Sequence, residues 1–136
     1  MLQKMRVLLL VCVTAVLAAC GGGGDDTPSF VGNYSLKLNL ISNNCNAAVP
    51  ASLVGTVAVN QNDRNVTIVT DGITSVGTVD ADNGGFSVSN TQVSSGIPVQ
   101  TVIAARTVTA GSSYAVRYSV TANQCSAIYT GTATKI

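Results

Sequence analysis

The chain has 136 residues, of which 46% are hydrophobic, 10% charged and 4% aromatic, and its formal net charge is +1. This length suits one domain with its own core. Its basic residues are scattered singly, which argues against a nucleic-acid-binding surface. The chain lacks His, Glu and Trp, so the commonest general base and metal ligand is absent. We therefore expect no catalytic residues, no metal site and no cofactor, and we do not expect an enzyme.

The first 20 residues have the pattern of an export signal. Lys4 and Arg6 form a positive start, and an apolar run follows from Val7 to Leu17. This run has the length of a secretory signal and is too short for a standard transmembrane helix. An ordinary cleavage site ends in small residues, whereas bulky Leu17 lies three residues before Cys20.

The tetrapeptide Leu17-Ala18-Ala19-Cys20 resembles the lipobox of bacterial lipoproteins and matches it at every position. The resemblance implies transfer of diacylglycerol to the Cys20 thiol, cleavage before Cys20, and acylation of the new amino group, typically with palmitate. Two or three acyl chains anchor a protein stably to a membrane. Gly21 follows Cys20 in place of the Asp that favours inner-membrane retention. In a Gram-negative cell this implies the outer membrane, on its periplasmic or surface face.

The predicted organisation has three parts. Residues 1–19 form the signal peptide, and residues 20–29 form the lipidated Cys20 with a Gly-rich tether. Residues 30–136 form one β-rich domain. The Gly-rich and polar composition of residues 21–29 suits a flexible linker that spans roughly 15–18 Å.

Apolar and polar residues alternate from Phe30 onward, as in strands with one buried and one wet face. The clearest examples run from Tyr34 to Leu40 and from Tyr114 to Val120. Eight strands are predicted, approximately over residues 31–41, 53–60, 65–70, 73–81, 85–91, 98–108, 113–122 and 126–135. The side chains predicted to be buried are Tyr34, Leu36, Leu38, Leu40, Val57, Val59, Ile68, Phe86, Val88, Val116 and Val120.

Short turn sequences such as Asp71-Gly72 separate the strands, and such dipeptides supply the positive φ of tight hairpins. Short links favour antiparallel neighbours. The predicted fold is therefore an all-β, antiparallel, up-and-down meander of about eight strands that closes into a small barrel, with a β-sandwich as the alternative. A barrel of this size is filled by side chains or holds one small ligand.

Four cysteines are present, of which Cys12 lies in the leader and Cys20 takes the lipid. The remaining pair, Cys45 and Cys125, predicts a disulfide in an oxidising compartment. The bond would join the loop after the first strand to the turn before the last. Those two positions are adjacent if the first and last strands pair to close the barrel.

Two other patterns have simpler explanations. Residues Asp80 to Gly85 resemble the start of an EF-hand loop, but Gly84 occupies the fifth, ligating position and Thr91 that of the bidentate Glu, so a hairpin turn is predicted there. For Tyr34, Tyr114, Tyr118 and Tyr129 we expect packing in the core with the hydroxyls near its rim; the alternative is that they line one end of a cavity.

In overall plan the domain resembles small barrel lipoproteins of bacterial envelopes, namely lipocalin-like carriers and membrane-bound lysozyme inhibitors. The lipocalin G-x-W signature is absent, and no functional residue is transferred from either family. We expect a structural or interaction module that binds an envelope protein or polymer. The alternatives are a small-ligand carrier and an enzyme-inhibitor barrel. An apolar cavity of roughly 300 Å³ or more would favour the carrier.

The lipobox generates a direct test. Replacing Cys20 with Ala should abolish fatty-acid labelling and leave an uncleaved or soluble protein, because the thiol is the nucleophile that takes the lipid. The control Cys12→Ala should be labelled like the parent. Unchanged labelling of the Cys20→Ala variant would contradict the assignment.

Overall fold

The structure, a computed structural model, describes residues 27–80 and 84–136. The lipobox, most of the tether and the centre of the predicted turn at 80–85 lie outside the described residues. The described chain forms eight strands: β1 (Gly32–Asn43), β2 (Ser52–Asn62), β3 (Asn65–Thr70), β4 (Ile73–Asp80), β5 (Gly85–Ser94), β6 (Ile97–Thr109), β7 (Ser113–Ala122) and β8 (Cys125–Lys135). Within the described ranges, no helix is long and apolar enough to cross a membrane.

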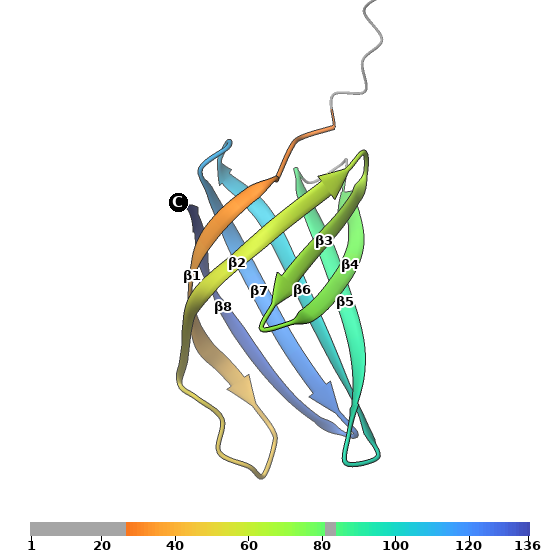
Figure 1. Ribbon diagram of the computed structural model, residues 1–136. Helices are drawn as coiled ribbons and strands as arrows, with labels where there is room; N and C mark the ends of the chain where they lie inside the picture. The colour runs from red at the N-terminus through yellow and green to blue at the C-terminus, as the bar shows by residue number, and fades with distance from the viewer. Residues whose placement is uncertain (1–26, 81–83) are drawn as a thin grey trace, which may run out of the picture.

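The strands form a closed barrel in which every neighbouring pair is antiparallel (Figure 1). β1 pairs with β2 on one side and with β8 on the other, from Tyr34 opposite Lys135 to Asn43 opposite Ala127. The prediction of an up-and-down barrel is confirmed, and the sandwich alternative is wrong. The predicted strand ranges agree with the observed ones to within about three residues at each end.

Turn chemistry explains the hairpins. Asp71 and Gly72 between β3 and β4 both have positive φ, at 50° and 78°. Ser95 and Gly96 between β5 and β6 repeat the pattern, at 52° and 79°. Two consecutive positive φ values are those of the tight turn whose twist matches that of a two-stranded hairpin.

Two glycines allow the strands to approach closely inside the barrel. A Cβ on Gly77 of β4 would lie 1.8 Å from the Ser87 carbonyl oxygen, and one on Gly131 of β8 would lie 1.9 Å from the Lys37 carbonyl oxygen. Only a residue without a side chain fits at such places, where strands bend strongly to close a small barrel. Gly131 lies at the β1–β8 seam, so it contributes directly to closure.

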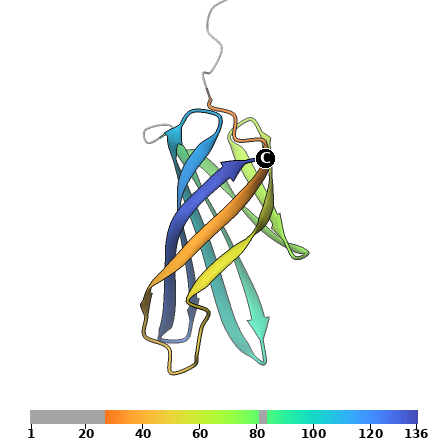
Figure 2. The same cartoon turned by 90° about the vertical axis from the view of Figure 1, so that its left-hand side faces the viewer.

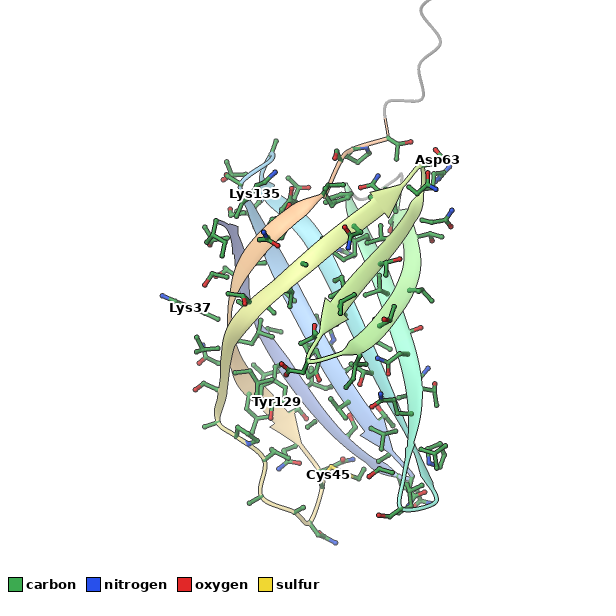
Figure 3. The ribbon with its side chains drawn as sticks, in the orientation of Figure 1. Lys37, Cys45, Asp63, Tyr129 and Lys135 are labelled. Carbon is green, nitrogen blue, oxygen red and sulfur yellow. A yellow bond between two sulfur atoms is a disulfide. The ribbon has the colours of Figure 1, made fainter. Side chains whose placement is uncertain are left out.

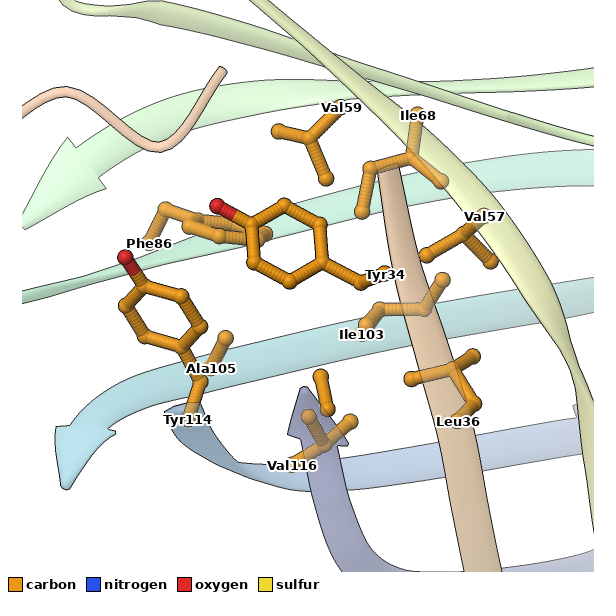
Figure 4. A pocket seen from close by; sticks show the side chains of 11 residues that line it. Tyr34, Leu36, Val57, Val59, Ile68, Phe86, Ile103, Ala105, Tyr114 and Val116 are labelled. Carbon is orange, nitrogen blue, oxygen red and sulfur yellow. The ribbon is translucent and has the colours of Figure 1, made fainter. Parts of the chain in front are cut away.

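One end of the barrel is filled by aromatic side chains (Figure 4). Phe30, which precedes β1, is 1% exposed, and its ring centroid lies 5.1 Å from that of Phe86 and 5.4 Å from that of Tyr114. The Tyr34 hydroxyl donates to the Phe30 carbonyl oxygen at 2.9 Å. The Phe30 amide in turn donates to the Gln61 side chain at 2.8 Å. Phe30 therefore plugs this end of the barrel, and we call this half the packed half.

Eight of the eleven side chains predicted to be buried are buried. Leu36, Leu40 and Val120 are only partly buried, so the prediction of full burial is wrong for them. Their register is as predicted, since Leu36 and Val120 line cavities inside the barrel. These three side chains are not fully buried because the half of the barrel that lies away from Phe30 is not filled by side chains.

The predicted disulfide joins Cys45, in the loop after β1, to Cys125, the first residue of β8. The two Cα atoms lie 4.7 Å apart, within the range that a disulfide requires. Nearby, the Asn44 side chain accepts a hydrogen bond from the Ser126 amide at 2.6 Å. The bond thus fastens the β1–β8 seam at the end opposite to Phe30.

Replacing both cysteines with Ala should lower the free energy of unfolding by about 2–5 kcal/mol, because the bond closes a loop of 80 residues. Urea denaturation of the oxidised protein and the variant measures the difference. The single variant Cys45→Ala should lose about as much as the double variant, since the second thiol has no partner. Equal stability of the parent and the double variant would contradict this role.

Candidate ligand-binding site

The half of the barrel beyond the aromatic plug is hollow. The space among the aromatic residues of the packed half is only about 20 Å³. The other half contains a cavity of about 480 Å³ and, next to it, a second of about 210 Å³. Leu53 and Tyr118 line both, so the two cavities are neighbours in one hollow half. The larger cavity is lined by Leu36, Leu38, Leu53, Val54, Gly55, Thr56, Val57, Thr70, Asp71, Ile103 and Tyr118.

A short hairpin leaves an opening in the wall of this half. β3 pairs with β2 only from Ala58 to Asn62, and β4 pairs with β5 only from Gly85 to Ser89. Ser52–Val57 of β2 and Asn90–Ser94 of β5 therefore extend beyond the β3–β4 hairpin, as Figure 1 shows. Figure 2 shows the same hairpin ending short of the other strands. We call the gap between these two strand segments and the Asp71-Gly72 turn the notch.

The larger cavity reaches solvent at the notch. Val54 lines the cavity and is 75% exposed, and Gly55 and Asp71 are exposed as well. Adding a Cβ to Gly55 would meet no atom within 4 Å, which agrees with open space beside this part of β2. Sheet pairing, as far as the chain is described, occupies only one edge of Ser52–Val57, the edge toward β1.

Aliphatic side chains form most of the interior wall. Leu36 and Leu38 come from β1, Leu53 from β2 and Ile103 from β6. Tyr118 projects from β7, and its ring centroid lies 6.0 Å from that of Tyr129. The Tyr129 hydroxyl donates to the Pro50 carbonyl oxygen at 3.0 Å. Figure 3 shows Tyr129 and Cys45 in this half of the barrel, with Asp63 and Lys135 at the opposite end.

Polar groups in the hollow half are few. The Asn90 side chain donates to the Ser75 hydroxyl at 3.0 Å, so these two groups satisfy each other. Thr70 ends β3 at the margin of the larger cavity, and its Oγ1 atom is buried without a hydrogen-bond partner among the described residues. Asp71 follows it at the notch and is the only charged side chain that lines the cavity in the described part of the chain.

Burial changes the acidity of two tyrosines. Desolvation, assisted by the neighbouring Tyr114, raises the pKa of Tyr34 well above its usual value near 10. Desolvation also raises the pKa of Tyr118, with an opposing contribution from its hydrogen bond to Thr101. Both hydroxyls therefore stay neutral at physiological pH, so Tyr118 presents an uncharged group to the cavity.

The geometry provides a space of about 480 Å³ in which a small molecule fits. Among residues 27–80 and 84–136, no group of three or more His, Cys, Asp or Glu residues lies close enough together to hold a metal ion. Of the predicted site residues, Cys45 and Cys125 are joined as described, and Cys20 lies outside the described residues. The Tyr34 and Tyr114 rings pack together in the filled end, as predicted, whereas Tyr118 lines the cavity.

Comparisons with protein-family models, with curated proteins and with solved structures gave no match to this chain. The site must therefore be interpreted from its own geometry.

The amino-acid sequence did not indicate which residues would bind a ligand, and it did not predict the notch. A signal for it was present, because the predicted third strand of six residues is shorter than its neighbours. Thr70 had no distinguishing signal, since a Thr at the end of a strand is ordinary in sequence. Only the closed barrel places this residue at the margin of the larger cavity.

The raised tyrosine pKa values predict an alkaline loss of stability. Above about pH 10 the unfolded chain releases phenolic protons that the folded chain retains, so the free energy of unfolding falls as pH rises. Absorbance titration should show Tyr34 and Tyr118 ionising at higher pH in the folded protein than in the unfolded chain. Urea denaturation should give lower stability at pH 11 than at pH 8. Ionisation of Tyr34 and Tyr118 near pH 10 in the folded state would contradict this prediction.

Proposed function

We propose that the mature chain is a lipid-anchored protein of the bacterial cell envelope whose barrel binds one small, largely apolar ligand in its hollow half. The observation that carries the proposal is the cavity of about 480 Å³ behind the notch. Small-molecule sites typically measure about 300–1,000 Å³ and combine an apolar wall with a few polar groups. The cavity fits this description, whereas a barrel that served only as a scaffold has no need of one.

The apolar surface that the hollow half leaves unburied also supports a ligand-binding role. Each Å² of apolar surface removed from water stabilises a protein by about 25 cal/mol. Leu36 and Leu53 line the hollow half and are only partly buried, so this stabilisation is incomplete in the free protein. A ligand with an apolar body would complete it. The packed half shows that this fold is able to fill its interior when suitable side chains are present.

The membrane anchor rests on the lipobox, and the fold is compatible with it. The described chain begins beside the packed half, where Phe30 enters the barrel, and the C-terminus lies at the same end (Figure 1). A tether that joins Cys20 to Phe30 would hold the packed half toward the membrane. The hollow half and its disulfide would then point away from it.

A structural or interaction module is the second candidate. Exposed valines on the four strands nearest the notch favour it, because apolar patches on an outer wall often mark protein contacts. These residues are Val54, Val69, Val76 and Val93, which are 75%, 40%, 58% and 72% exposed. A substitution inside the barrel would remove ligand binding and leave the exposed valines unchanged, so an experiment can distinguish the two candidate functions.

Filling the cavity tests the proposal. Leu53→Trp places a larger side chain between the two cavities and should weaken binding of a neutral apolar reporter dye by about tenfold or more, equivalent to about 1.4 kcal/mol. Leu53→Phe should have a smaller effect in the same direction. Dye fluorescence is measured on the full-length protein in phosphatidylcholine vesicles, with protein-free vesicles as the blank.

Val76→Trp is the matched control, because it adds the same indole group to an exposed position on β4. It should bind the dye like the parent. Dye binding by Leu53→Trp equal to that of the parent would contradict the cavity as the site, as would the absence of binding to the parent.

A further inference from the structure

Part of β2 has a backbone edge without a strand partner among the described residues. The opposite edge pairs with β1, and the Leu40 amide donates to the Ala51 carbonyl oxygen at 2.9 Å at the start of this pairing. Successive residues of an antiparallel strand direct their N–H and C=O groups to alternate edges. Every second residue from Ala51 therefore bonds to β1, and the residues between them direct both groups into the notch, because pairing with β3 begins only at Ala58. The residues that form this free edge are Ser52, Val54 and Thr56.

The free edge lacks the features that usually prevent a sheet from pairing with another chain. Sheet edges are commonly protected by charged side chains, by Pro or by a bulge. Ser52–Val57 contains no charged residue and no Pro, and its pairing with β1 runs without a register shift. All three residues of the free edge are exposed, Val54 by 75%. An edge of this kind is the surface to which an extended peptide binds by adding a strand to the sheet.

The notch has room for an added strand. Where the barrel is complete, β3 and β4 lie between β2 and β5. Neighbouring strands lie about 4.8 Å apart, and the notch in Figure 1 replaces both of the intervening strands. Of the two strands that border the notch, β2 lines the larger cavity and β5, in its described residues, does not. A strand that pairs with β2 therefore lies beside the opening of the cavity.

The alternation also determines where the side chains of an added strand point. Leu53 and Gly55 face the interior and line the larger cavity. Side chains directly opposite these two residues would lie on the same face of the sheet, so they would enter the hollow half. Gly55 leaves space for one of them, because even an added Cβ would meet no atom within 4 Å. The mainly aliphatic wall favours uncharged, apolar side chains at both positions.

We propose that the ligand is a short extended peptide that binds antiparallel to the free edge of β2 as an added strand. Its backbone exchanges hydrogen bonds with Ser52, Val54 and Thr56, and two apolar side chains enter the hollow half. A second copy of this chain does not suit the site, because the inward residues of its own free edge already line its own cavity. This inference rests on the proposed function and adds the chemical class of the ligand to it.

Two N-methylated peptides test the added strand on the unaltered protein. The parent probe is radiolabelled Thr-Leu-Thr-Leu-Thr, acetylated and amidated, whose threonines bond to β2 while its leucines face the cavity. An N-methyl group on the third residue replaces an N–H that faces β2, whereas one on the fourth residue faces away from β2. The first should weaken binding about fivefold or more, because it removes a hydrogen bond and places a methyl group between the strands. The second should bind like the parent probe. Binding to vesicles that carry the full-length protein is measured against protein-free vesicles.

Two proline variants form a matched pair on the protein side. Val54→Pro removes an N–H that faces the notch and leaves the hydrogen bonds to β1 in place, and Pro is tolerated at edge positions of this kind. It should weaken the parent probe about fivefold or more. Val93→Pro makes the same change in the part of β5 that extends beyond its pairing with β4, and it should bind the probe like the parent protein. Circular dichroism establishes that both variants are folded.

The outcomes distinguish this inference from the proposed function. Equal binding of the two methylated peptides, or equal binding of the probe by Val54→Pro and Val93→Pro, would overturn the added strand. A dimer of the detergent-solubilised full-length protein that sedimentation detects and Val54→Pro abolishes would also overturn it, because a second copy would then occupy the free edge. Binding of the apolar reporter dye in any of these cases would leave the cavity as a binding site. Failure of both the dye and the peptide to bind the parent protein would overturn the proposed function as well.

Discussion

The pairing of β1 with β8 is the constraint on which the rest of the structure depends. It converts a meander into a closed barrel and removes the two outer edges that an open sheet would expose. Closure also creates an interior, because every second side chain of all eight strands then faces one enclosed space. The disulfide from Cys45 to Cys125 fastens the seam at one end, and Gly131 lets β8 approach β1 closely along it.

Closure alone does not decide what the interior contains; the distribution of bulky side chains does. Aromatic rings from Phe30, Tyr34, Phe86 and Tyr114 meet in one half and leave almost no free volume there. The other half is lined mainly by aliphatic residues, and the short β3–β4 hairpin does not reach across it. One sequence thus produces a packed half that stabilises the fold and a hollow half that is accessible through the notch.

Much of the fold was predictable because its determinants are local. Alternation located the strands, and the Asp71-Gly72 dipeptide located a turn of the expected geometry. The pairing of Cys45 with Cys125 followed from the count of cysteines once Cys12 and Cys20 had been assigned elsewhere. These signals act within a few residues or through a covalent bond, so a single sequence was sufficient to recognise them.

The features of the candidate site were not predictable in the same way, because they depend on contacts between distant residues. Phe30 precedes the first strand, and nothing in its neighbours indicates that it crosses the mouth of the barrel to reach Phe86. Leu36 has the same alternation as Tyr34, yet it faces a cavity because the opposite wall is incomplete there. Whether an inward-facing residue is fully buried depends on what lies across the barrel, and periodicity does not contain that information.

The contrast between the two halves is the central claim, and methyl NMR of the full-length protein tests it most directly. On addition of a small apolar ligand such as decanol, the methyl resonances of Leu36, Leu38 and Leu53 should shift progressively and saturate. Those of Val59, Val66 and Val88, which are at most 3% exposed, should remain in place. Uniform shifts in both sets, or no shift in the leucines at saturating ligand, would contradict a barrel that is packed at one end and hollow at the other.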